Sequence, residues 1–336
     1  MQYRYLGRSA LKVSPLCLGA MMFGRATDEA TAQRIVAKAF GQGINFIDTA
    51  DVYAGGRSEE IVGHAIATAR DRWVLATKFG FSKGEGPNEQ GQSRKWIIET
   101  VHGSLRRLGT DYIDLLYFHR ALPDVTLEEG IRTVGDLIRQ GKVRYWGVSN
   151  FRAWRIAEAV RVAERLEVER PIASQPLYNI VERSAEVEEL PAAGYYGLGV
   201  VPYSPLARGV LTGKYRAGAP PPADSRAARG DKRIRETEYR PESMAIAAEI
   251  VAHAAVLGIG PVAYALAWVL RNRLVSAVIA GPRTEEQWDR YAEALEVKLG
   301  PAEEAFIDSL VAPGHPSTPG FTDPQYPVEG RRVDAD

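Results

Sequence analysis

The sequence predicts a single α/β domain folded as an eight-stranded (β/α)8 TIM barrel. Three observations lead to this fold class. Short apolar runs alternate with longer stretches of helical periodicity, the alternation occurs eight times, and several runs are apolar on both alternating faces. Strands covered by helices show that last pattern, and repeated strand–helix units form parallel sheets. Eight such units close naturally into a barrel.

The predicted strands follow one another along the chain and are separated by predicted helices. The strands cover residues 15–20, 44–49, 73–79, 112–119, 143–149, 171–176, 198–204 and 276–281. The helices cover residues 28–40, 57–69, 93–108, 126–139, 153–165, 184–193, 241–257 together with 262–271, and 285–295. Ser, Thr or Asp precede several of the helices, and Gly41, Gly109 and Gly141 follow three of them, which is the usual chemistry of helix ends.

Three segments lie outside this alternation. Residues 3–13 are predicted to form a small hairpin, which would plug the N-terminal end of a barrel. The loop after the seventh strand, residues 207–240, is rich in Gly, Pro, Ala and charge. A loop of this length inside a compact domain is usually functional or disordered. Residues 313–336 contain five prolines and little periodicity, so they are predicted to be an extended surface tail of the same 1–336 domain.

An open, doubly wound sheet is the alternative fold. That fold normally carries a glycine-rich turn after its first strand. Here the first predicted strand ends near Gly19 and continues as Ala20-Met21-Met22-Phe23-Gly24. This stretch lacks the required glycine spacing, and the barrel is therefore favoured.

The composition is that of a globular protein and restricts the partners. Hydrophobic residues make up 45% and charged residues 25% of the chain. Lys plus Arg and Asp plus Glu both number 42, so no net charge favours nucleic acid or an anionic membrane. No signal peptide and no apolar run of about 18 residues stand in the sequence, and a cytoplasmic location is the default expectation. The five histidines and the lone Cys17 show no zinc-ligand spacing, so no metal is expected, and the apolar neighbours of Cys17 predict a buried thiol.

Polar side chains end the predicted strands on what would be one rim of the barrel. Asp48 ends the second strand, with Tyr53 in its loop, Lys78 lies at the end of the third, and His119 ends the fourth. In α/β barrels the active site lies at this rim. Taken singly, a residue such as Tyr53 is more often a rim aromatic, and one such as His119 is more often a core histidine, than a catalytic group. Their joint placement is what favours chemistry, because buried polar groups cost free energy unless they are paired.

These four side chains together make a proton donor. A tyrosine has a reference pKa of about 10, and a nearby lysine ammonium lowers it by favouring the phenolate. The carboxylate of Asp48 would hold Lys78 charged and in place. His119 can donate a hydrogen bond to an oxygen that gains negative charge. Carbonyl reduction needs this set plus a source of hydride, which no side chain supplies, so a nicotinamide cofactor is implied.

Six motifs resemble, in order, the signatures of the aldo-keto reductase superfamily. They are GINFIDTADVYAGGRSEEIVGHAI (43–66), LATK (75–78), DYIDLLYFHR (111–120), GKVRYWGVSNF (141–151), YSPLARGVLTGKY (203–215) and VIAGPRTEEQ (278–287). The resemblance covers nearly the whole chain. The extended loop after the seventh strand is more similar to the bacterial and potassium-channel beta-subunit-like branch than to the classical mammalian reductases.

The resemblance implies a role for each matching residue. Tyr53 would be the general acid, Lys78 and Asp48 its tuning pair, and His119 the substrate-orienting histidine. The residues implied to hold the cofactor are Ser149, Asn150, Gln175, Tyr203, Ser204, Leu206, Gly209, Leu211, Lys214, Gly281, Arg283 and Gln287. Arg283 suits a 2′-phosphate by charge and fork geometry, which favours NADP(H) over NAD. Ala280 and Tyr291 depart from the Pro and Asn that the family often has, and both touch the adenosine end.

The predicted function is NADP(H)-dependent, reversible reduction of an aldehyde or ketone. One alternative is a binding subunit that senses the redox state of NADP(H) with little turnover, and another is a barrel without redox chemistry. The partner expected is a small carbonyl compound, with no nucleic acid or membrane, in a monomer or homo-oligomer. Candidates for the mouth of the substrate site are Met22, Phe23, Tyr53, Phe79, Trp146 and Arg120.

Overall fold

The computed structural model describes residues 1–122 and 124–328, and its centre is a barrel of eight parallel strands. The strands neighbour one another in the order β10-β3-β4-β5-β6-β7-β8-β9. Their bounds are β3 Leu16–Gly19, β4 Phe46–Asp48, β5 Val74–Phe79, β6 Ile113–Phe118, β7 Val143–Ser149, β8 Ala173–Gln175, β9 Gly199–Val200 and β10 Val278–Ala280. A parallel bridge joins Val200 of β9 to Val275, and the Ile279 amide of β10 donates to Pro202 O at 3.0 Å. Strand β9 therefore meets β10, and the barrel closes. The predicted fold class is confirmed.

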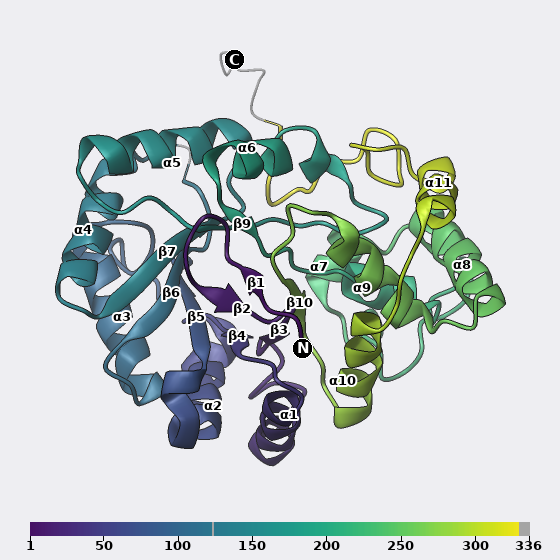
Figure 1. Cartoon of the computed structure of the whole chain (residues 1–336), viewed down its shortest axis with the longest axis horizontal. Coiled ribbons are helices and arrows are strands. Elements are labelled where there is room, and N and C mark those ends of the chain that lie inside the picture. Colours follow the sequence, from purple (N-terminus) through teal and green to yellow (C-terminus); the bar gives the residue numbers. More distant parts are fainter. Residues whose placement is uncertain (123, 329–336) are drawn as a thin grey trace.

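A ring of helices surrounds the strands (Figure 1). The helices are α1 Glu29–Gly41, α2 Arg57–Ile66, α3 Arg94–Leu108, α4 Glu128–Arg139, α5 Ala153–Arg165, α6 Glu189–Tyr196, α7 Lys232–Glu236, α8 Pro241–Val256, α9 Pro261–Arg271, α10 Glu285–Ala292 and α11 Pro301–Leu310. Side chains of Asp28, Ser93 and Thr284 accept hydrogen bonds from the first turns of α1, α3 and α10. Such caps satisfy amides that have no partner within the helix, and they set where each helix begins. The sequence analysis missed α7 and α11.

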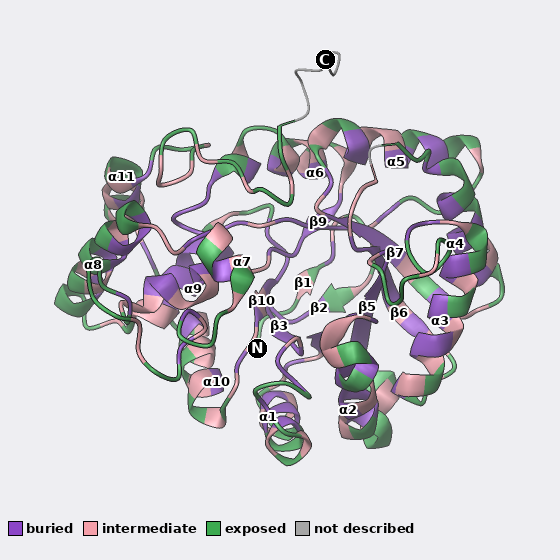
Figure 2. Ribbon diagram, turned by 180° about the vertical axis from the view of Figure 1, so that it is seen from behind, coloured by how far each residue is buried: buried purple, intermediate pink, exposed green. Residues whose placement is uncertain are grey.

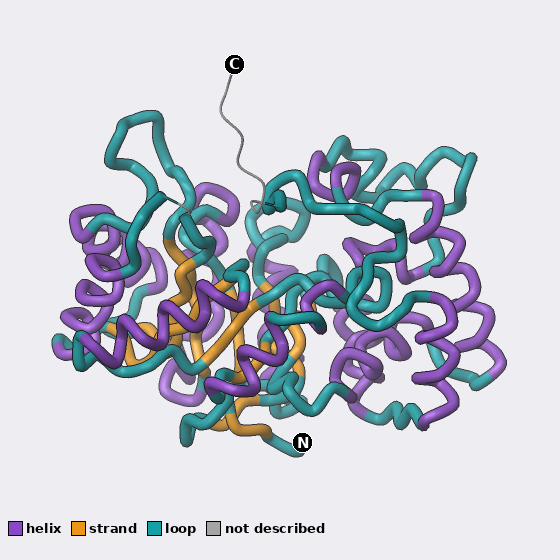
Figure 3. The backbone as a smooth tube through the Cα atoms, turned by 90° about the horizontal axis from the view of Figure 1, so that it is seen from above, coloured by secondary structure: helices purple, strands orange, loops and turns teal. Residues whose placement is uncertain are grey.

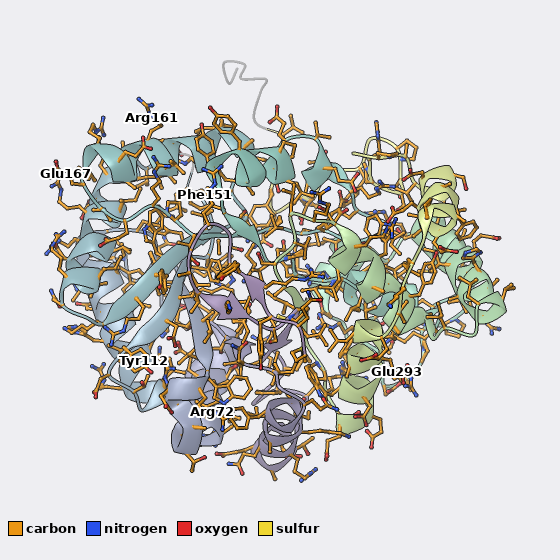
Figure 4. The ribbon with its side chains drawn as sticks, viewed as in Figure 1. Arg72, Tyr112, Phe151, Arg161, Glu167 and Glu293 are labelled. Carbon is orange, nitrogen blue, oxygen red and sulfur yellow. The ribbon has the colours of Figure 1, made fainter. Side chains whose placement is uncertain are left out.

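The apolar core has two layers. The larger layer lies between the strands and the helices, and the smaller one fills the inside of the barrel. Cys17 belongs to the inner layer and is fully buried, as predicted. Figure 2 shows the barrel strands largely buried and the helices buried on one side and exposed on the other. The exposed Arg72, Arg161, Glu167 and Glu293 lie on the outer ring in Figure 4.

The N-terminal hairpin closes one end of the barrel. It consists of the antiparallel pair β1 (Arg4–Tyr5) and β2 (Lys12–Val13), as the sequence predicts. Leu6 and Val13 are fully buried against the inner layer of the core. In Figure 3 the N-terminus lies at one end of the molecule and the longest loops lie at the other. The functional loops therefore gather at the open end of the barrel.

The long loop after β9 and the C-terminal tail pack against each other at the open end. In the tail, the Ser317 amide donates to Val181 O at 2.9 Å, and Arg240 lies over the Phe321 ring at 3.7 Å. Arg233 of α7 forms an ion pair of 2.5 Å with Asp323. The tail is thus more than the surface arm that the sequence predicts, because ion pairs and hydrogen bonds tie it to the long loop.

The lengths and compositions of the helices bear on whether one of them could cross a membrane. Among the described residues no single helix is long and apolar enough to cross a bilayer. Helices α8 and α9 are long and apolar enough only when taken together, and they are bent by 97° at the break between them.

Candidate active site

A cavity of about 810 Å³ opens at the carboxyl ends of the strands. It is lined by most of the residues that the sequence singles out: Asp48, Tyr53, His119, Ser149, Asn150, Gln175, Tyr203, Ser204, Leu206, Gly209, Lys214, Gly281, Arg283 and Gln287. Residues from the ends of six strands and from the long loop thus share one site. Cavities of this size, with apolar walls and a few placed polar groups, are typical of cofactor and ligand sites.

Asp48, Lys78 and Tyr53 form one connected group at the cavity wall, where Asp48 and Tyr53 line the cavity and Lys78 lies behind them. The Lys78 ammonium contacts Asp48 Oδ1, donates to Thr49 O at 2.6 Å, and lies 3.4 Å from the Tyr53 hydroxyl. Gln175 Nε2 donates to the other oxygen of Asp48 at 3.0 Å. Lys78 is fully buried and Asp48 almost fully buried. Every polar atom of this ion pair therefore has a fixed partner, as a buried pair requires.

The pKa values in this group reflect burial opposed by charge. Burial lowers the pKa of Lys78, but Asp48 and Tyr53 outweigh it, so the pKa lies above the usual value and Lys78 stays charged. Burial raises the pKa of Tyr53 more than Lys78 lowers it. From the Lys78 charge the sequence predicts a lowered pKa for Tyr53. Lys78 does act in that direction, but the loss of solvation on burial outweighs it, so the predicted net direction was wrong. Tyr53 is therefore a protonated phenol at neutral pH.

His119 faces the same space from the end of β6. Its ring lies edge-on to Tyr53, with centroids 5.8 Å apart, and edge-on to Phe81 at 4.6 Å. Burial and the charges of Lys78 and Arg120 hold the pKa of His119 well below its usual range, so the ring is neutral. Nδ1 is buried and has no hydrogen-bond partner among the described residues. A neutral imidazole beside the Tyr53 hydroxyl suits recognition of an uncharged oxygen.

The ends of β7, β8 and β9 carry a linked set of polar groups. Ser149 Oγ donates to Gln175 O at 2.9 Å, and Asn150 Nδ2 donates to His119 O at 2.9 Å. The Tyr203 hydroxyl donates to Asn150 Oδ1 at 2.8 Å. Asn150 has a left-handed backbone with φ 59°, a conformation that Asn tolerates better than most residues. These bonds fix the edge of the cavity next to Tyr53 and His119.

The far end of the cavity is crowded with positive charge. Burial and the charges of Arg283, Arg226 and Arg229 lower the pKa of Lys214, and Asp224 opposes them. Gly209 has φ 101°, a conformation that favours glycine, and the missing Cβ leaves room for the Lys214 ammonium beside the loop. An anionic ligand would relieve this repulsion, and the arrangement therefore fits the phosphates of a dinucleotide.

Hydrogen bonds from other residues at this end fix the loop after β10 and the start of the loop after β9. The Arg283 amide donates to Gln287 Oε1 at 2.8 Å, and Asn179 Nδ2 donates to Ser204 O at 3.0 Å. Tyr291, one of the two departures from the family pattern, lines the cavity, whereas Ala280, the other, is fully buried. The side chain of Leu211 is buried in the hydrophobic core beneath the loop and does not line the cavity, so only its backbone could meet a ligand there.

Several lining residues are not among those that the sequence predicts. Asp224 and Arg226 come from the long loop, and Gln325 and Tyr326 from the tail. Arg226 Nη2 reaches Met22 Sδ at 3.5 Å, so the long loop touches the loop after β3. Nothing in the spacing of these residues indicates that they meet. Of the residues expected at the mouth, Met22 and Tyr53 line the cavity, whereas Phe23, Phe79 and Trp146 are buried in the core, and Arg120 lies over the Phe81 ring without lining the cavity.

Comparison with known proteins agrees with this geometry. The sequence model of the Aldo/keto reductase family matches residues 15–312. The chain belongs to the aldo/keto reductase family. As a member of this family it is an oxidoreductase, and the family generally binds a nicotinamide cofactor, typically NADP(H).

Three relatives illustrate the range of names in the family. A probable voltage-gated potassium channel subunit beta of Oryza sativa subsp. japonica is 42% identical over 305 residues, 88% of this chain and 92% of the relative. The uncharacterized oxidoreductase YrpG of Bacillus subtilis is 39% identical over 310 residues, covering 89% and 92%. A putative voltage-gated potassium channel subunit beta of Schizosaccharomyces pombe is 37% identical over 318 residues, covering 92% and 89%.

Proposed function

We propose that this aldo/keto reductase catalyses the NADP(H)-dependent reduction of an aldehyde or ketone to the alcohol, and the reverse oxidation. One observation carries the proposal. The protonated hydroxyl of Tyr53 lines the cavity 3.4 Å from the Lys78 ammonium and next to the neutral ring of His119. A proton donor beside a hydrogen-bond donor is what the oxygen of a carbonyl requires as it gains charge.

The residues have distinct tasks in this reaction. Bound NADPH supplies the hydride. Tyr53 donates its proton to the substrate oxygen, and His119 orients that oxygen by a hydrogen bond. The Lys78 ammonium stabilises the phenolate that Tyr53 leaves, and Asp48 keeps Lys78 charged and in position. Interactions that strengthen as charge develops are those that accelerate the chemical step.

The cofactor would lie along the cavity from the nicotinamide to the adenosine end. Ser149, Asn150 and Gln175 would bind the carboxamide, and Tyr203 would stack on the ring. The backbone of the loop from Ser204 to Gly209 and the ammonium of Lys214 would hold the pyrophosphate. Arg283 is the proposed partner of the 2′-phosphate, because it lines the cavity and meets only Asp224 at 3.6 Å among the acids described.

The test is binding followed by turnover. Titrating the protein with NADPH and with NADH, and following the quenching of tryptophan fluorescence, measures the affinity for each cofactor. We expect micromolar or tighter binding of NADPH. A panel of aryl, aliphatic and sugar aldehydes and ketones, with NADPH oxidation followed at 340 nm, then measures turnover. Failure of both NADPH and NADH to bind would exclude the redox function.

A second function is favoured by the names of the relatives. Two of the three are named as potassium channel beta subunits. A subunit that binds NADP(H) to sense its redox state would bind the cofactor tightly and turn over negligibly on every member of the panel. The complete set of Asp48, Tyr53, Lys78 and His119 supports turnover instead. A cytoplasmic location, the oligomeric state and the lack of nucleic-acid or membrane partners stay predictions from the sequence.

A further inference from the structure

Arg120 is a half-buried cation beside the cavity that the proposed reaction does not use. It follows His119 directly after β6, and its guanidinium carbon lies 4.7 Å from the centre of the Phe81 ring. The Phe81 ring itself lines the cavity and lies edge-on to the His119 ring, with centroids 4.6 Å apart. A single aromatic ring therefore separates this guanidinium from the part of the cavity where a carbonyl would be reduced.

The guanidinium of Arg120 has no anionic partner among the residues that the structure describes. None of their carboxylates lies within 4.0 Å of it, and its buried Nε donates to no acceptor there. Arg233, another cation at the cavity, is by contrast paired with Asp323 of the tail. A partly buried charge costs free energy when it is unpaired. Arg120 thus offers charged donors that the described part of the fold leaves unused.

The phosphates of a bound cofactor would lie too far away to become this partner. Lys214 and Arg226 belong to the long loop after β9, and Arg283 follows β10. Arg120 and Phe81 instead follow β6 and β5. In the closed barrel, β7 and β8 separate β6 from β9, and β3 and β4 separate β5 from β10. The two cationic regions therefore stand on opposite sides of the rim.

The charge of Arg120 acts inside the cavity. Burial, followed by the charges of Lys78 and Arg120, lowers the pKa of His119. Burial raises the pKa of Tyr326 to about 12, and the charges of Arg233 and Arg120 act against that shift. Tyr326 lines the cavity from the tail. The positive potential of Arg120 thus extends over the space between the end of β6 and the tail, next to the proposed proton donor.

We propose that the preferred substrates are carbonyl compounds that carry a carboxylate, and that Arg120 binds this carboxylate while His119 and Tyr53 meet the carbonyl oxygen. The effect on turnover rests on the proposed function, whereas binding of the anion does not. A guanidinium presents its donors as a rigid fork that fits a carboxylate. One guanidinium also balances the single charge of a carboxylate, whereas a phosphate dianion would keep one charge without a partner.

The part of the substrate between its two polar ends would meet Phe81. Phe81 lines the cavity between Arg120 and His119. Aromatic rings pack well against one another in tilted or offset arrangements. An aryl aldehyde with a carboxylate in the para position has the required order of groups, with the carbonyl at one end, a flat ring in the middle and the anion at the other end.

The experiment compares para-formylbenzoate with its neutral isostere para-formylbenzamide, using NADPH. We expect the ratio of the two kcat/KM values to fall about 10–100-fold in Arg120→Met, through a higher KM for the carboxylate. Comparing ratios between proteins cancels the different intrinsic reactivities of the two aldehydes. Arg120→Lys keeps the charge without the fork and should retain part of the preference. Added salt should reduce the preference of the wild type, because it screens a partly exposed charge.

Arg161→Met is the matched control, since Arg161 is an exposed arginine of α5 that does not line the cavity (Figure 4). It should leave the ratio unchanged. Binding is measured separately from turnover by calorimetry of the two corresponding alcohols, para-(hydroxymethyl)benzoate and para-(hydroxymethyl)benzamide, with and without NADPH. We expect the wild type to bind the carboxylate more tightly than the amide, and Arg120→Met to bind the two alike.

Two results would overturn the proposal. One is equal or undetectable binding of the two alcohols by the wild type, which needs no variant. The other is a preference for the carboxylate that persists in a folded Arg120→Met protein. The proposed function fails in a different way. If the carboxylate binds through Arg120 but neither aldehyde is reduced, the anion site stands and the proposed reduction does not.

Discussion

The hydroxyl of Tyr203 donates a hydrogen bond to Oδ1 of Asn150 at 2.8 Å, and this bond joins the loop after β9 to the end of β7. Asn150 Nδ2 is used elsewhere, on His119 O and on Ser149 Oγ. Tyr203 is therefore the only described partner of the Asn150 carbonyl oxygen. The bond holds an aromatic ring and an amide in a fixed relation at the edge of the cavity.

Removing this bond should weaken cofactor binding. In Tyr203→Phe the ring remains but Asn150 loses its donor, and a typical hydrogen bond contributes about 1 kcal/mol. We expect the Kd for NADPH to rise about 5–10-fold, measured by fluorescence quenching. Tyr195→Phe serves as the control, because Tyr195 is 77% exposed and lies on α6. Equal affinities for NADPH in the two variants would contradict the prediction.

Tyr53→Phe should abolish reduction and leave cofactor binding intact. The variant keeps the ring but lacks the proton, and a general acid typically contributes about 10²–10⁴-fold. We expect kcat on the best carbonyl of the panel to fall by that factor. The Kd for NADPH, measured on the same preparation, should change less than about twofold. Wild-type turnover in this variant would show that another group supplies the proton.

The buried ion pair of Lys78 and Asp48 should matter for stability as well as for chemistry. Lys78→Met leaves the Asp48 carboxylate buried without its cation, and breaking a buried pair in this way typically costs about 3–5 kcal/mol. Urea unfolding should show this loss. The double variant Lys78→Met/Asp48→Asn, which has no buried charge, should recover a large part of it. A double variant no more stable than the single one would speak against charge as the cause.

Arg283 should decide between the two nicotinamide cofactors. Arg283→Met removes the proposed partner of the 2′-phosphate, and hydrogen bonds to charged groups contribute about 1.5–3 kcal/mol, so the Kd for NADPH should rise roughly 10–100-fold. The Kd for NADH should stay unchanged. Arg34→Met is the control, because Arg34 lies on the outside of α1 and pairs with Glu285. An equal rise in the Kd for NADPH and for NADH would show that Arg283 does not bind the 2′-phosphate.

The raised pKa of Asp51 should give the stability a definite dependence on pH. Burial raises its pKa to about 7 in the folded chain, against a usual value of 3.8. The folded state therefore binds this proton more tightly than the unfolded state does. The resulting contribution to the free energy of unfolding is fully present below about pH 4 and is lost as pH rises to 7. The free energy of unfolding of Asp51→Asn, measured relative to the wild type, should therefore be larger at pH 8 than at pH 4, by on the order of 3 kcal/mol. Urea unfolding at both pH values measures this, and a difference that does not depend on pH would contradict it.

Much of the fold could be predicted from the sequence because strands and helices have different apolar periods. All eight predicted strands exist, although β9 is reduced to Gly199–Val200. Helix α11 was missed because only Ile307 of its ten residues is buried, so it shows no apolar stripe. The predicted segment 184–193 contains a helix that begins only at Glu189 and runs on to Tyr196.

The site was predictable where strand ends carry it and not where loops fold over it. Asp48, Lys78 and His119 follow from the geometry of a barrel, which places strand ends on one rim. Asp224 and Tyr326 reach the cavity from segments without periodicity, and their meeting depends on contacts between distant parts of the chain. The direction of the Tyr53 pKa depends on depth of burial, which a list of neighbouring charges does not contain.

The tail that carries Tyr326 has a consequence for how this protein can diversify. Its backbone is fixed by Arg152 Nη2, which donates to Tyr326 O at 3.0 Å, and by the ion pair of Asp323 with Arg233. These contacts lie outside the two layers of the barrel core. Mutations in residues 321–328 can therefore reshape one wall of the cavity without disturbing the strands that hold Asp48, Lys78 and His119. Selection can alter which substrate enters while the strand-end residues stay as they are.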